Sequence, residues 1–298
     1  MSAHARFQRA DRGRKTFPPH GWIGAVLVVV FWSINWGLSG PRTHWAFFPL
    51  WLGYCLTVDA IVFYRTGTSL VARSAARYAG LFLVSAPAWW LFELLNLRTQ
   101  NWVYQGADHF TPLAYAFWTT LSFSTVLPAV LGSAELMASF DLPRRLPRGP
   151  RIGPGRVTTA LFFAAGWISL GLLLALPQLF FPLAWFSIYF IVEPVNIWMG
   201  NRALTDGTRN GDWRPVYALW LGVLVTAFFW EMWNYHSFPK WIYRIPWGDW
   251  LHVFEMPLLG YGGYLPFSLE LFALYHLVLG LLGKPRHDYV HISARSPG

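Results

Sequence analysis

Residues 157–180 read VTTALFFAAGWISLGLLLALPQLF, a run of 24 residues without a single charged side chain. At a rise of about 1.5 Å per residue, a helix of this length crosses the ~30 Å hydrocarbon core of a bilayer. Seven further apolar blocks of similar character lie at residues 22–38, 45–64, 78–97, 111–140, 182–199, 216–235 and 251–282. The sequence therefore predicts an all-α, polytopic transmembrane helix bundle of about eight spans.

The composition of the whole chain agrees with this class. Of the 298 residues, 55% are hydrophobic and only 12% are charged, whereas soluble domains average roughly 25% charged residues. The formal net charge of +9 does not indicate nucleic acid, because the basic residues fall in short loops between apolar blocks and form no single basic surface. The partner that the composition predicts is the lipid bilayer.

Several site classes are excluded or disfavoured by the residue inventory. Cys55 is the single cysteine, so an intrachain disulfide is impossible and a cysteine-ligated metal site is not expected. The sequence has no His-Glu-x-x-His, Gly-x-Ser-x-Gly or phosphate-loop motif. We therefore predict neither a metal site nor a bound cofactor.

Lysine and arginine residues indicate the orientation of the spans. If the N-terminus is cytoplasmic, 19 of the 23 basic residues fall in inner segments and 4 in outer segments. The positive-inside rule requires this bias in short loops. We expect a cell (inner) membrane protein with both termini in the cytoplasm, a basic N-terminal tail at 1–21, a basic linker at 141–156 and a C-terminal tail at 283–298.

The halves at 22–140 and 157–282 share ordered sequence patterns, which predict two tandem four-helix repeats. Matched positions are separated by 133–139 residues throughout. Phe47-Phe48-Pro49 followed by Asp59 matches Phe180-Phe181-Pro182 followed by Glu193. Glu93-x-x-Asn96 followed by Trp102-x-Tyr104 matches Glu231-x-x-Asn234 followed by Trp241-x-Tyr243. Leu127-Pro128 matches Leu265-Pro266. Parallel repeats of this kind are related by an axis along the membrane normal.

Half of the 14 acidic residues lie within the apolar blocks. A charge at the bilayer centre costs on the order of 3 kcal/mol on insertion scales, so these groups are expected to face the interior of the bundle or lie near its ends. No lysine or arginine lies within the blocks, so ion pairs are not expected to be the general means of stabilising them. The seven are Asp59, Glu93, Glu135, Glu193, Glu231, Glu255 and Glu270.

Their positions along the blocks suggest catalytic candidates. Glu93 and Glu231 lie near the outer ends of their helices, with Asn96 and Asn234 on the same helical face. Glu255 is expected to enter from the outer side on the eighth helix, one turn after His252, whereas Asp59 and Glu193 lie deeper. For any single carboxylate, polar contact between helices is an equally good explanation.

The last apolar block is too long for one straight span. It contains Gly260-Tyr261-Gly262-Gly263-Tyr264 and then Pro266, which predicts a break or a re-entrant turn. Non-helical backbone at membrane depth is tolerated only against protein or a wet cavity, so the break also indicates a cavity.

Two tryptophan-rich, glutamate-bearing segments carry a family resemblance. Residues 89–93 (Trp-Trp-Leu-Phe-Glu) and 230–234 (Trp-Glu-Met-Trp-Asn) resemble the membrane-embedded lycopene cyclase and fungal transmembrane terpene cyclase families. The resemblance implies a helical bundle whose acidic residues donate protons to an isoprenoid. It covers these short segments and the general architecture, and the order of the Pro-x-Glu-Glu signature is reversed here in Glu193-Pro194 and Glu255-Met256-Pro257.

Three functions remain open from the sequence. The first is an intramembrane enzyme that acts on an apolar lipid or isoprenoid by carboxylic acid–base chemistry, with aromatic side chains stabilising a cation. The second is a proton- or cation-coupled transporter of small solutes, which needs a path between the outer and inner carboxylates. The third is a non-catalytic scaffold. For the first, the candidate substrate-binding residues are Trp90, Trp230, Trp233, Tyr261 and Tyr264.

Overall fold

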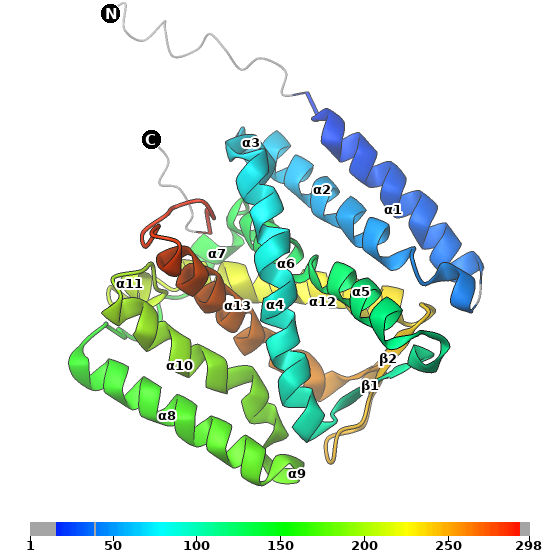
Figure 1. Cartoon of the computed structure of the whole chain (residues 1–298). Helices are drawn as coiled ribbons and strands as arrows, with labels where there is room; N and C mark the ends of the chain where they lie inside the picture. The colour runs from blue at the N-terminus through cyan, green and yellow to red at the C-terminus, as the bar shows by residue number, and fades with distance from the viewer. Residues whose placement is uncertain (1–15, 39, 293–298) are drawn as a thin grey trace, which may run out of the picture.

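The computed structural model describes residues 16–38 and 40–292, and in this part of the chain the protein is a bundle of long apolar helices (Figure 1). Eight helical segments there are long and apolar enough to cross a membrane, which confirms an all-α, multi-pass membrane protein. The outer parts of the predicted terminal tails, residues 1–15 and 293–298, lie outside the described residues.

The spans are built from nine longer helices. They are α1 (Pro19–Gly37), α2 (Phe47–Thr66), α4 (Ala75–Thr99), α5 (Pro112–Phe123), α6 (Val126–Ala138), α8 (Arg156–Ala175), α10 (Ala184–Trp198), α12 (Arg214–Asn234) and α13 (Tyr261–Leu281). Short elements join them: η2 (Pro41–Thr43), α3 (Leu70–Arg73), η3 (Ala107–His109), α7 (Leu142–Arg145), α9 (Pro177–Phe180), η4 (Phe181–Leu183), α11 (Thr205–Thr208) and η5 (Leu258–Gly260). Four short strands complete the fold: β1 (Trp102–Gln105), β2 (Lys240–Tyr243), β3 (His252–Val253) and β4 (Met256–Pro257).

Side-chain caps and prolines set several helix starts. The hydroxyl of Ser74 accepts a hydrogen bond from Arg77 N at the start of α4, and Thr111 caps α5 in the same way, with Pro112 at its first position. Such residues satisfy backbone N–H groups that have no partner within the helix. The bundle has two ends, which we call the strand end, where β1 and β2 lie, and the terminal end, where α1 begins and α13 finishes (Figure 1).

The block at 111–140 forms one span that is interrupted between α5 and α6. The gap at Ser124 and Thr125 is bridged by a side chain of α4: Ser85 Oγ donates to Phe123 O at 2.6 Å and accepts from Leu127 N at 2.9 Å. Backbone groups freed inside a membrane must find a protein partner, and Ser85 supplies it.

The expectation for the last block is corrected in two respects. Residues 252–257 form the antiparallel β3–β4 pair and not the beginning of a helix, so Glu255 lies before the span and His252 is not one helical turn from it. The glycine-rich segment marks where α13 begins, at Tyr261, and Pro266 lies inside that helix. The predicted break at residues 260–266 is therefore wrong, because Tyr261 to Pro266 belong to one continuous helix and the irregular backbone lies before it.

Close packing at small residues joins the helices. α1 lies along α2, where Gly24 approaches Gly53, and α8 lies along α10. At the centre, α6 packs along α12: a Cβ added at Gly222 would lie 2.5 Å from Ala134 N and 2.6 Å from its Cα. Small residues permit such backbone contact between membrane helices.

We predict that Gly222→Val destabilises the protein. The new side chain would meet the backbone of α6, and overpacking of this kind typically costs about 1–3 kcal/mol. Thermal unfolding in detergent should show a clearly lower Tm than the wild type. Gly171→Val in α8 is the matched control, because a Cβ there meets nothing within 4 Å; equal melting of the two variants would contradict the assigned α6–α12 contact.

Candidate functional site at the strand end

One carboxylate oxygen of Glu93 accepts hydrogen bonds from three aromatic side chains. This atom, Oε1, accepts from Trp89 Nε1 at 2.9 Å, Trp102 Nε1 at 3.1 Å and the Tyr104 hydroxyl at 2.5 Å. Trp89 lies one turn before Glu93 on α4, whereas the other two belong to β1. The carboxylate thus fixes β1 to the end of α4.

Glu231 on α12 has a related environment. Its Oε1 atom accepts from the hydroxyls of Tyr243 at 2.7 Å and Tyr264 at 2.5 Å. Trp241 Nε1 donates in turn to the Tyr243 hydroxyl at 3.0 Å. Glu231 is fully buried, and its Oε2 atom has no hydrogen-bond partner among the described residues. One oxygen of this carboxyl group is therefore free to hold a proton.

The strand tyrosines remain hydrogen-bond donors. Burial, together with the neighbouring Glu231 charge, raises the pKa of the Tyr243 hydroxyl well above its usual range. Burial and the charge of Glu93 act in the same direction on the pKa of Tyr104. Both phenols accordingly keep their protons at neutral pH.

Asn96 and Asn234 fix the backbone of the strands. Asn96 donates to Trp102 O at 2.8 Å and accepts from Asn101 N at 2.9 Å. Asn234 donates to Trp241 O at 2.7 Å and accepts from Trp241 N at 2.9 Å. These asparagines connect each helix to the strand that follows it, and act as positioning residues in this geometry.

The two strands pair with each other. β1 and β2 are antiparallel, with Trp102 opposite Tyr243 and Tyr104 opposite Trp241. Since each strand is bound to its own glutamate, the pairing brings the surroundings of Glu93 and Glu231 to the same end of the bundle (Figure 1).

A cavity of about 1530 Å³, its open mouth included, lies between these strands and the ends of α4, α5, α10, α12 and α13. Sixteen of its 28 lining residues are Trp, Tyr or Phe, and none is Lys, Arg, Asp or Glu. Its polar lining consists of hydroxyl, indole, amide and imidazole groups, including the hydroxyls of Tyr104, Tyr243 and Tyr264. The six tryptophans that line it are Trp89, Trp102, Trp118, Trp185, Trp230 and Trp241.

The predicted substrate-binding residues divide into two groups. Trp230 and Tyr264 line the cavity and lie face to face, with ring centroids 6.1 Å apart. Trp90, Trp233 and Tyr261 are not among its lining residues. Trp90 donates to Thr120 Oγ1 at 3.0 Å, Trp233 is buried against Trp51, and the Tyr261 hydroxyl donates to Val253 O at 3.2 Å.

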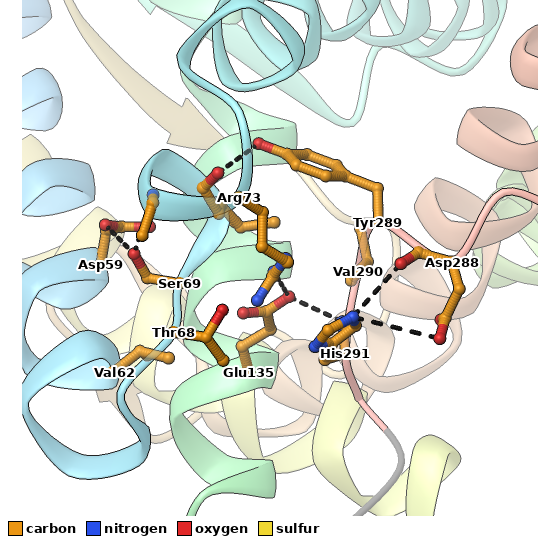
Figure 2. Close-up of polar contacts among 12 residues, drawn as sticks. Asp59, Val62, Thr68, Ser69, Arg73, Glu135, Asp288, Tyr289, Val290 and His291 are labelled. Atoms are coloured by element: carbon orange, nitrogen blue, oxygen red, sulfur yellow. Dashed lines mark hydrogen bonds and ion pairs between the residues drawn. The ribbon is translucent and has the colours of Figure 1, made fainter.

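Asp59 and Glu193 lie at the terminal end, where each holds the loop that follows its helix. Asp59 accepts from the Ser69 hydroxyl at 2.7 Å and from Val71 N at 3.0 Å (Figure 2), and its Oδ2 atom lies 3.0 Å from His20 Nε2. Glu193 accepts from Thr205 N at 3.0 Å. In both cases the backbone donor lies twelve residues after the carboxylate.

Two of the seven carboxylates form ion pairs with an arginine or a lysine from outside the spans. Glu255 pairs with Lys240 Nζ at 2.5 Å, and Glu135 pairs with Arg73 of α3. Glu135 also accepts from His291 N at 2.7 Å, and the adjacent Tyr289 hydroxyl donates to Leu70 O at 2.8 Å (Figure 2). The segment before residue 293 is thereby bound into the terminal end.

Most of the cavity wall, including Trp185 and Phe267, was not predicted from the sequence. The Trp-x-Tyr pairs were recognised as repeated patterns but not as donors to the glutamates. The available signal was the recurrence of Glu-x-x-Asn and Trp-x-Tyr in the same order. Within the described residues, no group of three His, Cys, Asp or Glu could hold a metal ion.

Comparisons of this chain with protein-family models, with curated proteins and with solved structures find no match. The resemblance to the lycopene and terpene cyclase families therefore stays a prediction from two short segments.

We predict that Asn234→Ala weakens the strand end. The substitution removes both side-chain bonds to Trp241, and an unsatisfied buried polar group costs about 1–3 kcal/mol. Thermal unfolding followed by tryptophan fluorescence should show a lower Tm than the wild type. Asn210→Ala, at an exposed turn, should leave the Tm unchanged; a similar loss in both variants would argue against the bracing role of Asn234.

Proposed function

We propose that this protein is an intramembrane enzyme that binds an apolar lipid, such as an isoprenoid, in the strand-end cavity and moves protons on it. One observation carries the proposal: three tyrosines that line an aromatic cavity donate hydroxyl hydrogen bonds to glutamates, namely Tyr104 to the half-buried Glu93 and Tyr243 and Tyr264 to the buried Glu231. This arrangement combines an apolar binding surface with acid–base groups in one place.

The lining favours a hydrocarbon ligand. Ligand sites are concave and mostly apolar, with a few polar groups that orient the ligand. The strand-end cavity has this character, and it has no charged lining residue that could neutralise a phosphate or carboxylate group. Its tryptophan and tyrosine faces attract positive charge, so they would stabilise a carbocation that forms on the bound lipid.

Glu231 and Tyr264 are the proposed proton-transfer pair. Tyr264 lines the cavity and its hydroxyl donates to Glu231, whose other oxygen has no partner among the described residues. In the proposed step this hydrogen bond first reverses, so that the protonated Glu231 carboxyl group donates to the Tyr264 oxygen and the Tyr264 O–H turns toward the lipid. The Tyr264 O–H bond then breaks as its proton forms a C–H bond with an alkene carbon, and the Glu231 proton passes to the phenolate oxygen. Loss of a proton from a neighbouring carbon of the cation restores the pair. The net reaction is an isomerisation or cyclisation that needs no co-reactant.

We further propose that residues 22–140 and 157–282 are tandem repeats related by an axis along the membrane normal. Three features support this proposal: Val103 pairs with its sequence counterpart Ile242, the α1–α2 contact has a counterpart in α8–α10, and Asp59 and Glu193 each bind a backbone N–H twelve residues later. The distribution of basic residues places the terminal end in the cytoplasm of a bacterial-type inner membrane. In that orientation the cavity lies toward the outer side.

Transport of a solute larger than a proton receives less support from the geometry. It requires a path that joins the outer carboxylates to Asp59 and Glu193, but neither of these residues lines the cavity. Both are bonded to loop backbone at the opposite end. A scaffold role is favoured by no particular contact.

Glu231→Gln should trap the substrate. The amide keeps the shape of the side chain but cannot deliver a carboxyl proton, so the unconverted lipid should accumulate on the protein. Mass spectrometry of lipids retained after mild detergent purification should show one apolar lipid, close to one per chain, enriched in Glu231→Gln relative to the wild type. Glu255→Gln is the control, because Glu255 lies outside the cavity lining. Bulk phospholipid alone in all three samples would contradict the proposal.

Tyr264→Phe separates binding from proton transfer. The ring that stacks on Trp230 is kept, and only the hydroxyl bonded to Glu231 is lost. We expect unchanged lipid retention and a roughly 10²-fold or greater loss of conversion, as for removal of a general acid. The lipid identified in the preceding experiment is the substrate for this assay. Tyr217→Phe, at the terminal end, should convert it at the wild-type rate, and full activity of Tyr264→Phe would refute the assigned donor.

A further inference from the structure

The interface between α10 and α13 contains several fully buried polar atoms that have no hydrogen-bond partner among the described residues. They are Ser187 Oγ and Glu193 Oε2 on α10, and Glu270 Oε2 and both ring nitrogens of His276 on α13. All four residues are completely inaccessible to solvent. Buried polar groups in native proteins are nearly always paired with protein, water or an ion, so each of these atoms requires an occupant.

Two direct contacts join α10 to α13 along the stretch that carries these atoms. Glu270 Oε1 accepts from Ile188 N at 3.2 Å, which places Glu270 beside the backbone next to Ser187. Further along, Asn196 Nδ2 donates to Ala273 O at 2.9 Å. Glu193 and His276 each lie six residues beyond the first pair, about 9 Å further along their helices toward the terminal end.

The two helices connect two hollow regions. At the strand end, Trp185 of α10 and Tyr264 and Phe267 of α13 line the aromatic cavity. At the terminal end, a polar hollow is lined by Arg202, Leu204 and Phe272, among others. The residue after Leu204, Thr205, donates its backbone N–H to Glu193.

The first half of the chain lacks this feature at the corresponding carboxylate. Both oxygens of Asp59, the sequence counterpart of Glu193, have hydrogen-bond partners in Ser69 and Val71. Of these two corresponding carboxylates, only Glu193 has an oxygen without a partner among the described residues.

We propose that the α10–α13 interface holds a file of water molecules that conducts protons between the terminal-end hollow and the strand-end cavity, with Glu270 as the relay. Buried waters typically make about three hydrogen bonds to groups of this kind. Each relay group accepts one proton and releases one, so the file is unchanged after a transfer. The inference deepens the proposed function, on which it rests, because the route would let the Glu231–Tyr264 pair exchange protons with the terminal end between turnovers.

A metal cation is a poorer occupant of this interface. Within the described residues, no three His, Cys, Asp or Glu side chains come together as a metal site. The atoms without partners also follow one another along the helices and do not surround one point. A relay of single proton carriers fits this arrangement.

The test is infrared spectroscopy of the full chain in lipid bilayers, with exchange from H₂O to D₂O. A carboxyl group buried without a cation should be protonated, so the wild type should show a carboxylic acid C=O band that is absent from Glu270→Gln. Water in the interface should let the Glu270 proton exchange for deuterium, so this C=O band should shift rapidly after transfer to D₂O. The band should shift more slowly in Ser187→Ala.

Ser268→Ala is the matched control. Ser268 is also buried on α13, but its hydroxyl already donates to Leu265 O at 2.7 Å, and it lies about 200° around the helix from Glu270. In the Ser268→Ala variant, the carboxylic acid band of Glu270 should exchange as in the wild type. A Glu270 band that exchanges only on unfolding, or no band assignable to Glu270, would overturn the proposal. So would a band that appears only when Na⁺ is removed.

The enzyme proposal and the proton-route proposal can be refuted independently of each other. Lipid accumulation in Glu231→Gln together with a non-exchanging Glu270 band would leave the enzyme proposal intact and remove the proton route. Rapid exchange at Glu270 with only bulk phospholipid bound would remove the enzyme proposal and leave a proton-accessible interface.

Discussion

The need to satisfy polar groups inside a membrane determines how this bundle is built. Unpaired polar groups in hydrocarbon cost several kcal/mol each. Glu93 meets this need by collecting three donors from α4 and β1, and Glu231 by collecting the hydroxyls of Tyr243 and Tyr264. Because β1 also pairs with β2, the carboxylates, the strands and the helix ends become one connected structure.

The same need is met differently at the two ends of the bundle. At the terminal end, Asp59 and Glu193 accept backbone hydrogen bonds from loops, and Glu135 pairs with Arg73 and the backbone of His291. Those carboxylates hold connecting segments in place. At the strand end, the donors are aromatic side chains that also line a cavity, so the same hydrogen bonds hold the cavity wall in place.

The combination of aromatic faces and buried carboxyl groups gives the cavity its chemical character. The surroundings are apolar enough to bind hydrocarbon, while the tyrosine–glutamate pairs can exchange protons with it. The α10–α13 interface adds polar groups that extend from this site toward the other end of the bundle. In the proposed function, lipid binding, proton transfer and proton exchange with the terminal end would take place in three neighbouring parts of one structure.

The sequence alone determined the membrane class, the eight spans and the positions of the intramembrane carboxylates, because these follow from runs of apolar residues about twenty long and from the charges between them. It also identified the Glu-x-x-Asn and Trp-x-Tyr patterns. Only the tertiary structure decided what these patterns do, since the hydrogen bonds of Glu231 and Asn234 join residues from different elements. It likewise decided that Glu255 precedes the last span and pairs with Lys240, that Trp230 faces the cavity while Trp90 and Trp233 do not, and that Trp89 and Trp185 line it. Which face of an apolar helix meets its neighbours depends on packing between distant segments, and in a helix that is apolar all round the sequence pattern carries little record of that choice.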